Sequence, residues 1–368
     1  MANDSRAPRA DVEKVLAEFD TQQDTLATFC ARTKALIEVS LQDAGIRYQS
    51  VQTRVKTRKK LREKYQDPQK DYKHLSDITD LAGLRVITYY EEDLDRVSEV
   101  IRREFTIDEA NSSDRRLGDP DTFGYRAINL ICEHQDKRKT DVEYKRFAGV
   151  RCEIQITSIL SHAWSEMEHE WYDLKDAYPS LTKRRFKRLA ALLELAAAEF
   201  EDIRKKRTEY ERSVAVRVEA NVLDLPLDAV SLRSFMEHEP IVAELDSAVA
   251  KVFGVAVADR EVGRLAEHWL PGVALLGFKN LRELRDELVQ YKDVIPEFMK
   301  RTSAEVWAGI KVDHFFRGAS IYQLGLLLSS LRGPDALMQY FARFHVLVNW
   351  DLMRLVSIAN DLTKPTRP

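Results

Sequence analysis

Two apolar segments of β-type composition, each followed by a segment of helical periodicity, constrain the fold of this chain most strongly. Residues 81–90 (LAGLRVITYY) are rich in β-branched and aromatic residues, which predicts a buried strand. Residues 91–105 (EEDLDRVSEVIRREF) follow with apolar residues at helical spacing. Residues 150–156 (VRCEIQI) predict another strand, and the chain becomes helical from Ile159. Strands that alternate with helices in this way predict a mixed α/β unit.

Further segments extend this unit at both ends. Residues 9–44 carry apolar residues at helical spacing and end at Gly45, which predicts one amphipathic helix or a pair of helices. Residues 46–56 and 125–134 predict two more strands. One long helix is expected over about residues 181–218.

The best candidate for a domain boundary is the proline-bearing segment 221–230, because everything beyond it has helical character. We therefore expect two domains. Residues 1–220 are predicted to form an α+β domain with a mixed sheet flanked by helices. Residues 221–368 are predicted to form an all-helical module of unknown role.

Composition excludes several classes of protein. The 368 residues are 44% hydrophobic and 32% charged, with a formal net charge of −3, which argues against disordered, fibrous and membrane proteins. The N-terminus lacks the apolar core of a secretory signal, and the apolar stretch at 344–359 is too short and too charged to span a bilayer. The three cysteines form no CxxC pair. We expect a cytoplasmic protein without a membrane partner.

The densest cluster of charge is residues 54–64 (RVKTRKKLREK), which contain seven cations and one Glu. The cluster begins at the end of a predicted strand and lacks the interleaved acids that pair with cations on a helix surface. A strand end that leads into a cationic helix suits a polyphosphate, because backbone N–H groups and Lys or Arg side chains converge there. An ordinary solvated helix face is the alternative.

Two acidic residues adjoin predicted strands. Asp80 directly precedes residues 81–90, and Glu153 lies inside the apolar strand at 150–156. A carboxylate in such a strand is costly unless it is paired or faces a polar cleft; a turn residue at 80 and an edge-strand residue at 153 are the alternatives. If both face one cleft, they suit Mg²⁺, which binds one or two carboxylates together with phosphate oxygens. With the cationic cluster they suggest phosphoryl-type transfer.

Two other features are open to more than one interpretation. Tyr125 follows a turn-rich segment and precedes Arg126, where a tyrosine can stack on a nucleobase or begin a buried strand. His162, Glu166 and His169 share one helix face, and a metal site there is the weaker alternative to packing. The chain has no P-loop and no GxGxxG motif, which argues against P-loop ATPases and Rossmann enzymes.

Five segments in the order RVKTRKKLREK, ITDLAGLRV, FGYRAIN, CEIQI and HAWSEMEHEWYDLK resemble the synthetase domain of the RelA/SpoT family, the (p)ppGpp synthetases. The resemblance covers about residues 40–180 and implies a nucleotidyltransferase-like mixed sheet flanked by helices. It also implies a GTP pyrophosphokinase of the stringent response. Such enzymes transfer the β,γ-pyrophosphate of ATP to the 3′-hydroxyl of GDP or GTP with Mg²⁺ present.

The resemblance implies roles for the donor side of the site. By their positions in the basic motif, Arg54, Lys56 and Lys64 match the residues that bind ATP. Asp80 matches a Mg²⁺-binding aspartate. Glu153 matches the acid that completes the metal site and helps to activate the attacking hydroxyl.

On the acceptor side, Tyr125 matches the tyrosine that stacks on the guanine base, and Arg126 adjoins it in the acceptor-binding motif. Gln155, Glu168 and His169 lie in matching motifs, and the resemblance implies supporting roles for them.

The chain departs from the family pattern at three positions. Ala127 and Asn129 stand where the family has Ser and His in GYxSxH, and Thr157 stands where it has an arginine. These changes are expected to weaken guanine-nucleotide binding, to alter the acceptor, or to mark a degenerate enzyme. The absence of any His-Asp dipeptide argues against the family's hydrolase domain, so we expect a synthetase-only protein.

Two other functions remain open. A related toxin would transfer pyrophosphate to the 3′ end of tRNA, with the basic clusters at 137–139, 183–188 and 204–207 guiding the RNA backbone. A catalytically degenerate chain would instead serve as a nucleotide-binding sensor. The expected partners are ATP and GDP, GTP or tRNA. A homo-oligomer, and an antitoxin or regulatory partner bound through residues 221–368, are alternatives that the sequence leaves open.

Overall fold

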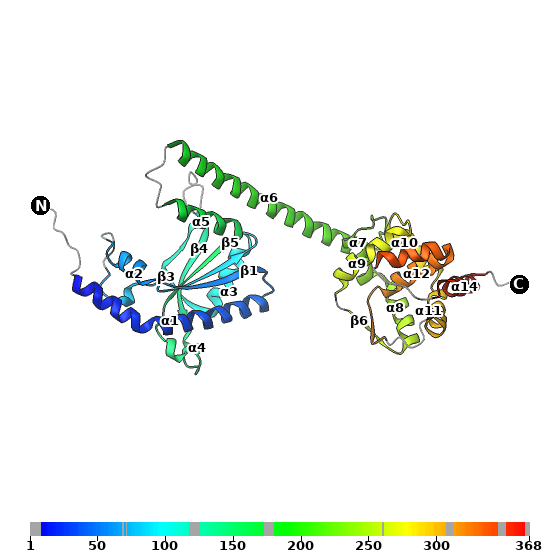
Figure 1. The fold of residues 1–368 in the computed structure, drawn as a ribbon, viewed down its shortest axis with the longest axis horizontal. Coiled ribbons are helices and arrows are strands. Elements are labelled where there is room, and N and C mark those ends of the chain that lie inside the picture. Colours follow the sequence, from blue (N-terminus) through cyan, green and yellow to red (C-terminus); the bar gives the residue numbers. More distant parts are fainter. Residues whose placement is uncertain are drawn as a thin grey trace. The chain divides into compact units, whose positions relative to one another are not determined.

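The computed structural model describes residues 9–67, 70, 72–117, 126–172, 180–259, 261–306, 312–344 and 351–364. The chain divides into two compact units, Met1–Arg204 and Lys205–Pro368 (Figure 1). The first unit is the expected α+β domain, in which helices flank a mixed sheet. No helix within the described ranges combines the length and the apolar composition needed to cross a membrane.

The sheet of the first unit has five strands: β1 (Tyr48–Val55), β2 (Ala82–Thr88), β3 (Phe105–Asp114), β4 (Ala127–His134) and β5 (Cys152–Ser158). Their order across the sheet is β1-β2-β5-β4-β3. Strands β2 and β5 run parallel, and all other neighbours are antiparallel. The sequence analysis missed β3, because FTIDEANSSD is a largely polar edge strand in which only Phe105 is buried.

The helices of the first unit are α1 (Arg9–Asp43), α2 (Arg58–Tyr65), α3 (Asp93–Glu104), α4 (Asp136–Lys139) and α5 (Ile159–Tyr172), together with the first part of α6 (Ser180–Glu219). The expected helix over residues 9–44 is confirmed as the single helix α1. Gly45 follows it with φ of 63°, a left-handed conformation that glycine adopts at little cost.

Successive side chains of a strand point to opposite faces of its sheet, and this alternation separates two different surfaces here. One surface is buried against α1 and α3 and consists of apolar side chains: Leu84, Val86, Ile128, Leu130, Ile154 and Ile156. The other surface carries polar side chains: Arg85, Asn129, Glu153 and Gln155. Helix α5 lies on this polar side, opposite α1 (Figure 1).

The second unit contains α7 (Ala229–His238), α8 (Pro240–Phe253), α9 (Val262–Leu275), α10 (Leu281–Gln290), α11 (Val294–Glu305), α12 (Ala319–Arg332), α13 (Pro334–Arg343) and α14 (Leu352–Thr363). The expectation of an all-helical module is wrong in one respect, because β6 (Ala256–Ala258) and β7 (His314–Phe316) pair in parallel. Strands of three residues are too short to leave an alternation pattern in the sequence.

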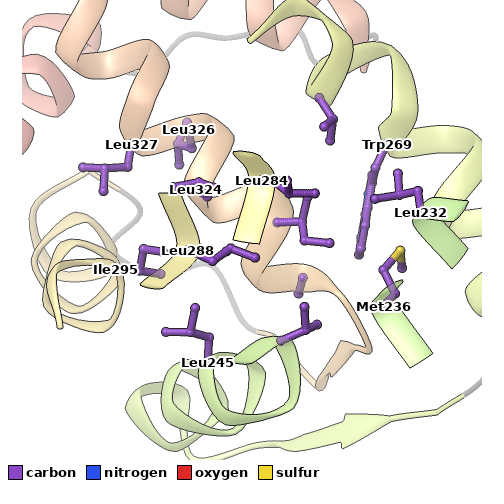
Figure 2. Packing of buried hydrophobic residues seen from close by; sticks show 14 of the residues in the cluster. Leu232, Met236, Leu245, Trp269, Leu284, Leu288, Ile295, Leu324, Leu326 and Leu327 are labelled. Carbon is purple, nitrogen blue, oxygen red and sulfur yellow. The ribbon is translucent and has the colours of Figure 1, made fainter. Parts of the chain in front are cut away.

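The second unit has its own apolar core, in which Leu245, Trp269 and Leu324 come from different helices (Figure 2). Val214 and Val218 near the end of α6 belong to the same core. The compact unit therefore begins inside α6, earlier than the proline-bearing segment. The domain boundary at residue 220 stays a prediction.

Candidate active site

The cationic cluster spans the end of β1 and the short helix α2. Thr57 caps this helix, because its side-chain oxygen accepts a hydrogen bond from the backbone N–H of Lys60 at 3.3 Å. Leu61 and Tyr65 are buried and fix α2 against the domain core. The strand-to-helix arrangement expected for this cluster is thus confirmed.

Two arginines of the cluster do not face the polar side of the sheet. Arg58 pairs with Asp20 and Glu13, and the Arg62 Nη2 atom lies 2.8 Å from Glu13 Oε1. Both acids belong to α1, far away in sequence. The cluster therefore does have neutralising acids, which a search for acids within the same helix could not find.

Two lysines of the cluster converge on Asp80. The Nζ atoms of Lys56 and Lys64 each lie 2.9 Å from Asp80 Oδ2. Burial acts to raise the pKa of Asp80, but the hydrogen bonds and charges of the two lysines outweigh it and hold the pKa below its usual value. The second carboxylate oxygen, Oδ1, is buried and accepts no hydrogen bond from the described residues.

A row of three residues crosses the sheet beside this ion-pair cluster. Arg54 on β1 stands opposite Gly83 on β2, and Gly83 stands opposite Glu153 on β5. A Cβ atom at position 83 would lie 3.2 Å from Arg54 Cγ and 3.3 Å from Arg54 Nε. Glycine therefore leaves room for the arginine side chain to lie against β2.

The row lines a cavity of ≈ 170 Å³ on the polar side of the sheet. The other residues around it are Gln52, Thr53, Leu84, Arg85, Gln155 and Glu166. Glu153 makes no hydrogen bond or ion pair with any residue in the described ranges. A carboxylate in this setting is available to bind a cation or to accept a proton. Asp80 is not part of the cavity lining, so the expectation that both acids face one cleft stays a prediction.

Arg85 is a functional candidate that the sequence analysis missed. Its Nε donates to Gln155 Oε1 at 2.6 Å, and its Nη1 lies 2.9 Å from His162 Nδ1 and 2.7 Å from Glu166 Oε1. Burial lowers the pKa of His162, and the charge of Arg85 lowers it further against the opposing effect of Glu166. Arg85 lies within an apolar strand, the same signal that singled out Glu153.

The network around Arg85 bears on the alternative metal site on α5. His162 and Glu166 both contact the guanidinium group, which occupies the side of the helix where a metal ion would bind. Within the described part of the chain, no three His, Cys, Asp or Glu side chains are grouped so that they could hold a metal ion.

On the acceptor side, Tyr125 lies outside the described residues. Arg126 directly precedes β4, and its Nε atom lies 3.5 Å from Glu91 Oε2. The backbone carbonyl of Arg126 accepts a hydrogen bond from Thr157 Oγ1 at 3.1 Å. Thr157, one of the departures from the family pattern, is therefore a buried residue that ties β5 to the start of β4.

Part of the first unit is similar to known proteins. A family model described as "Region found in RelA / SpoT proteins" matches residues 53–176. Residues 53–176 are similar to this region, and we call them the RelA/SpoT region. The resemblance expected from the five sequence segments is confirmed.

Among curated proteins, the chain is similar to GTP pyrophosphokinase YwaC of Bacillus subtilis (strain 168), with 29% identity over 116 residues. The alignment covers 31% of this chain and 52% of YwaC, so the chain spans about half the length of that relative. Similar solved structures include small alarmone synthetase 1 from Bacillus subtilis, with 23% identity and a TM-score of 0.41, covering 52% of this chain and 99% of that one. Another is a GTP pyrophosphokinase family protein from Streptococcus pneumoniae, with 21% identity and a TM-score of 0.44, covering 52% and 96%.

The remaining predicted residues lie in or beside the RelA/SpoT region's polar face. Gln155 lines the cavity and accepts the hydrogen bond from Arg85. Asn129 is buried opposite Gln155, and its Oδ1 accepts no hydrogen bond from the described residues. Glu168 is half-buried on α5 outside the cavity lining, and His169 lies on α5 with its side chain outside the described structure.

The RelA/SpoT region has a donor set that fits Mg²⁺. Among the described residues, none donates a hydrogen bond to the buried Oδ1 of Asp80, and none pairs with the carboxylate of Glu153. Carboxylate oxygens are the protein ligands that Mg²⁺ prefers, usually one or two of them with water and phosphate completing the shell. The chemistry of these two side chains therefore suits this ion.

Proposed function

We propose that the chain is a pyrophosphokinase that transfers the β,γ-pyrophosphate of ATP to the 3′-hydroxyl of GDP or GTP, making (p)ppGpp in the cytoplasm. The observation that carries this proposal is the row Arg54, Gly83 and Glu153 beside the pair of lysines on Asp80. In support of it, this arrangement combines a carboxylate that is unpaired among the described residues with concentrated positive charge, in the segment that matches the RelA/SpoT family model. The nucleotidyltransferase-like character of the sheet is part of the same proposal.

The donor nucleotide binds through Arg54, Lys56 and Lys64. Ammonium and guanidinium groups form strong charge-assisted hydrogen bonds with phosphate oxygens. Lys56 and Lys64 already lie at one point, held there by Asp80. Binding of the triphosphate lets both lysines exchange part of their contact with Asp80 for contacts with phosphate.

Asp80 and Glu153 would hold Mg²⁺, and the ion would neutralise charge on the phosphate oxygens. Glu153 accepts the proton of the 3′-hydroxyl. The hydroxyl oxygen forms a bond to the β-phosphorus, the bond from that phosphorus to the oxygen bridging to the α-phosphate breaks, and AMP leaves with the electron pair.

The acceptor base stacks on Tyr125, with Arg126 beside it. Gln155 and Arg85 hold each other through a 2.6 Å hydrogen bond next to Glu153. Gln155 and Arg85 thereby keep the polar face of the sheet rigid. Glu168 and His169 on α5 have a supporting role at the same face.

The test offers the purified full-length chain Mg²⁺, ATP labelled at the γ-phosphate, and GDP, GTP or bulk tRNA as separate acceptors. Label that moves to a guanosine nucleotide in the wild-type chain and not in Glu153→Gln supports the proposal. Glu133→Gln serves as the matched control, since Glu133 lies on β4 outside the cavity and pairs with Lys139. No transfer to any acceptor contradicts the proposal and favours a nucleotide-binding sensor.

A second acceptor is favoured by one observation. Arg184, Arg185, Lys187 and Arg188 are all exposed near the start of α6 and form a basic surface suited to an RNA backbone. Label in tRNA, lost when these four residues are changed to Ser, would show that the same chemistry acts on RNA. Label confined to GDP or GTP would exclude this acceptor.

A further inference from the structure

The second unit contains a partly open cavity of ≈ 470 Å³, and the described residues that line it all belong to this unit. It lies among α8, α9, α11, α12 and β7 and is walled by six aromatic side chains: Phe253, Trp269, Phe315, Phe316, Tyr322 and Phe344. Figure 2 shows Trp269 among the buried residues of the core, and the cavity lies beside this core. Its volume falls within the range of cavities that bind small organic molecules.

The described residues that line the cavity carry no charge of the Asp, Glu, Lys or Arg type. Their polar groups include the side chains of Ser303 and Gln323, two histidines and the hydroxyl group of Tyr322. A charged ligand would lose its hydration here without gaining a counter-ion. The described part of the lining therefore favours a neutral molecule.

Gln323 on α12 gives the cavity a specific polar feature. Its side chain is 2% exposed, and its Oε1 atom is buried without a hydrogen-bond donor from the described residues. An unpaired buried acceptor is uncommon, because burying it removes its bonds to water. A ligand that carries an N–H or O–H group would satisfy it.

Asp246 is a deeply buried acceptor of the same unit that does have hydrogen-bond donors. It is 1% exposed, and its two carboxylate oxygens accept the backbone N–H groups of Gly318 at 2.6 Å and Ser320 at 2.8 Å. Those bonds cap the N-terminus of α12 and explain the burial of Asp246. Among the described residues, no comparable partner explains the burial of Gln323.

His314 adds a second polar atom to the same wall. Its Nε2 atom is buried and has no hydrogen-bond partner in the described structure, while its ring packs edge-on against Phe316 with centroids 4.7 Å apart. Two buried polar atoms that lack partners in the described structure thus belong to a lining that also contains Ser303 and His268 but is mostly aromatic and aliphatic.

We propose that this cavity is a binding site for a neutral, aromatic small molecule that donates a hydrogen bond to Gln323. The aromatic walls provide stacking and apolar contact, and Gln323 and His314 orient the polar group. The site does not depend on the proposed transferase function, since every residue that forms it lies in the second unit.

The test uses N-phenyl-1-naphthylamine, a neutral aromatic amine with one N–H group whose fluorescence rises in apolar surroundings. The full-length chain is titrated alongside two variants of α11. Ser303→Trp fills the cavity, and Ala304→Trp places the same side chain at the neighbouring exposed position, which does not line it. We expect saturable binding to the wild-type chain and to Ala304→Trp, and at least tenfold weaker binding to Ser303→Trp. Equal affinity for the two variants, or no saturable binding to the wild-type chain, would overturn the proposal.

Two further comparisons test the ligand class. The sulfonated analogue 1-anilinonaphthalene-8-sulfonate should bind at least tenfold more weakly, and equal binding contradicts selection for a neutral molecule. Gln323→Leu should weaken binding of the amine about three- to tenfold and leave its N-methyl derivative unaffected, because only the amine donates a hydrogen bond. An equal loss for both probes would contradict the role of Gln323. Far-UV circular dichroism verifies the fold of each variant, and the Ser303/Ala304 pair decides the proposal if Gln323→Leu does not fold.

Discussion

The two faces of the five-stranded sheet are made by the same strands and have opposite characters. On β5, Ile154 and Ile156 are fully buried against the helices α1 and α3. Between and beside them, Glu153 and Gln155 line a polar cavity on the side of α5. A change of one position along this strand thus separates a residue that stabilises the fold from a candidate catalytic residue.

The comparison shows how the core positions the site. Burial of one face fixes the register of the strands, because a slip of one residue would turn the apolar set toward water. The fixed register aligns Arg54, Gly83 and Glu153 across three strands. These three residues are aligned by the packing of the opposite face of the sheet. The side chains of Arg54 and Glu153 therefore remain available for a ligand.

The largest effect is expected for Glu153→Gln, which removes the proposed proton acceptor and one proposed metal-binding carboxylate while keeping the shape of the side chain. Transfer should fall by about 10²- to 10⁴-fold. The free energy of unfolding should change little, because Glu153 makes no ion pair within the described structure. Label transfer and urea unfolding measure the two quantities.

Activity within a few-fold of wild type in Glu153→Gln would remove this residue from the site. Asp80→Asn is a less selective variant, since it leaves the amino groups of Lys56 and Lys64 together without their shared carboxylate. A fall in activity there would combine loss of a ligand with disturbance of α2.

The adjacent change Ile154→Ala should have the opposite profile. Ile154 is 0% exposed, and its truncation leaves a cavity on the α1 face that should lower the free energy of unfolding by about 2–5 kcal/mol. The rate of pyrophosphate transfer per folded molecule, measured at about 15 °C, should equal that of the wild-type chain. A variant that is as stable as wild type but inactive would show that the two faces are not separable.

His134 on β4 gives the buried face a pH dependence of its own. Burial, together with the charges of Arg138 and Lys139, lowers the pKa of His134 to about 4. In the unfolded chain the pKa is about 6.5. Between these values the unfolded chain binds a proton that the folded chain does not, so the free energy of unfolding falls as the pH falls through this window.

Between pH 7.5 and 5 this proton should lower the free energy of unfolding by about 2 kcal/mol more in the wild-type chain than in His134→Gln. Urea unfolding of both proteins at the two pH values gives the difference. The same loss in both would show that His134 does not titrate in the folded core.

The smallest effect is expected for Gly83→Ala. The new methyl group would lie 3.2 Å from Arg54 Cγ, so the arginine side chain must shift by a few tenths of an ångström. We expect a rise of up to about tenfold in the KM for ATP with little change in stability. Unchanged kinetics would mean that Arg54 has room to move without loss of its contact with the nucleotide.

Much of this organisation is predictable from sequence, because it depends on local patterns. Alternation and helical periodicity predicted α1, the central strands and the position of Glu153 inside a strand. They could not predict that Glu13 of α1 pairs with Arg62, or that Arg85 joins Gln155 to α5, since these contacts connect residues far apart in sequence. The polar edge strand β3 and the three-residue strands of the second unit lacked a pattern strong enough to detect.

We propose that the polar face transfers the β- and γ-phosphates of ATP together, as one pyrophosphate group. The most direct test is ³¹P nuclear magnetic resonance of a single reaction. The full-length chain is incubated with ATP, GDP and Mg²⁺, and the products are followed over time. We expect two products to form in equal amounts: AMP, and a new diphosphate group on the 3′-oxygen of the guanosine nucleotide. Formation of ADP and phosphate without this new group would contradict it.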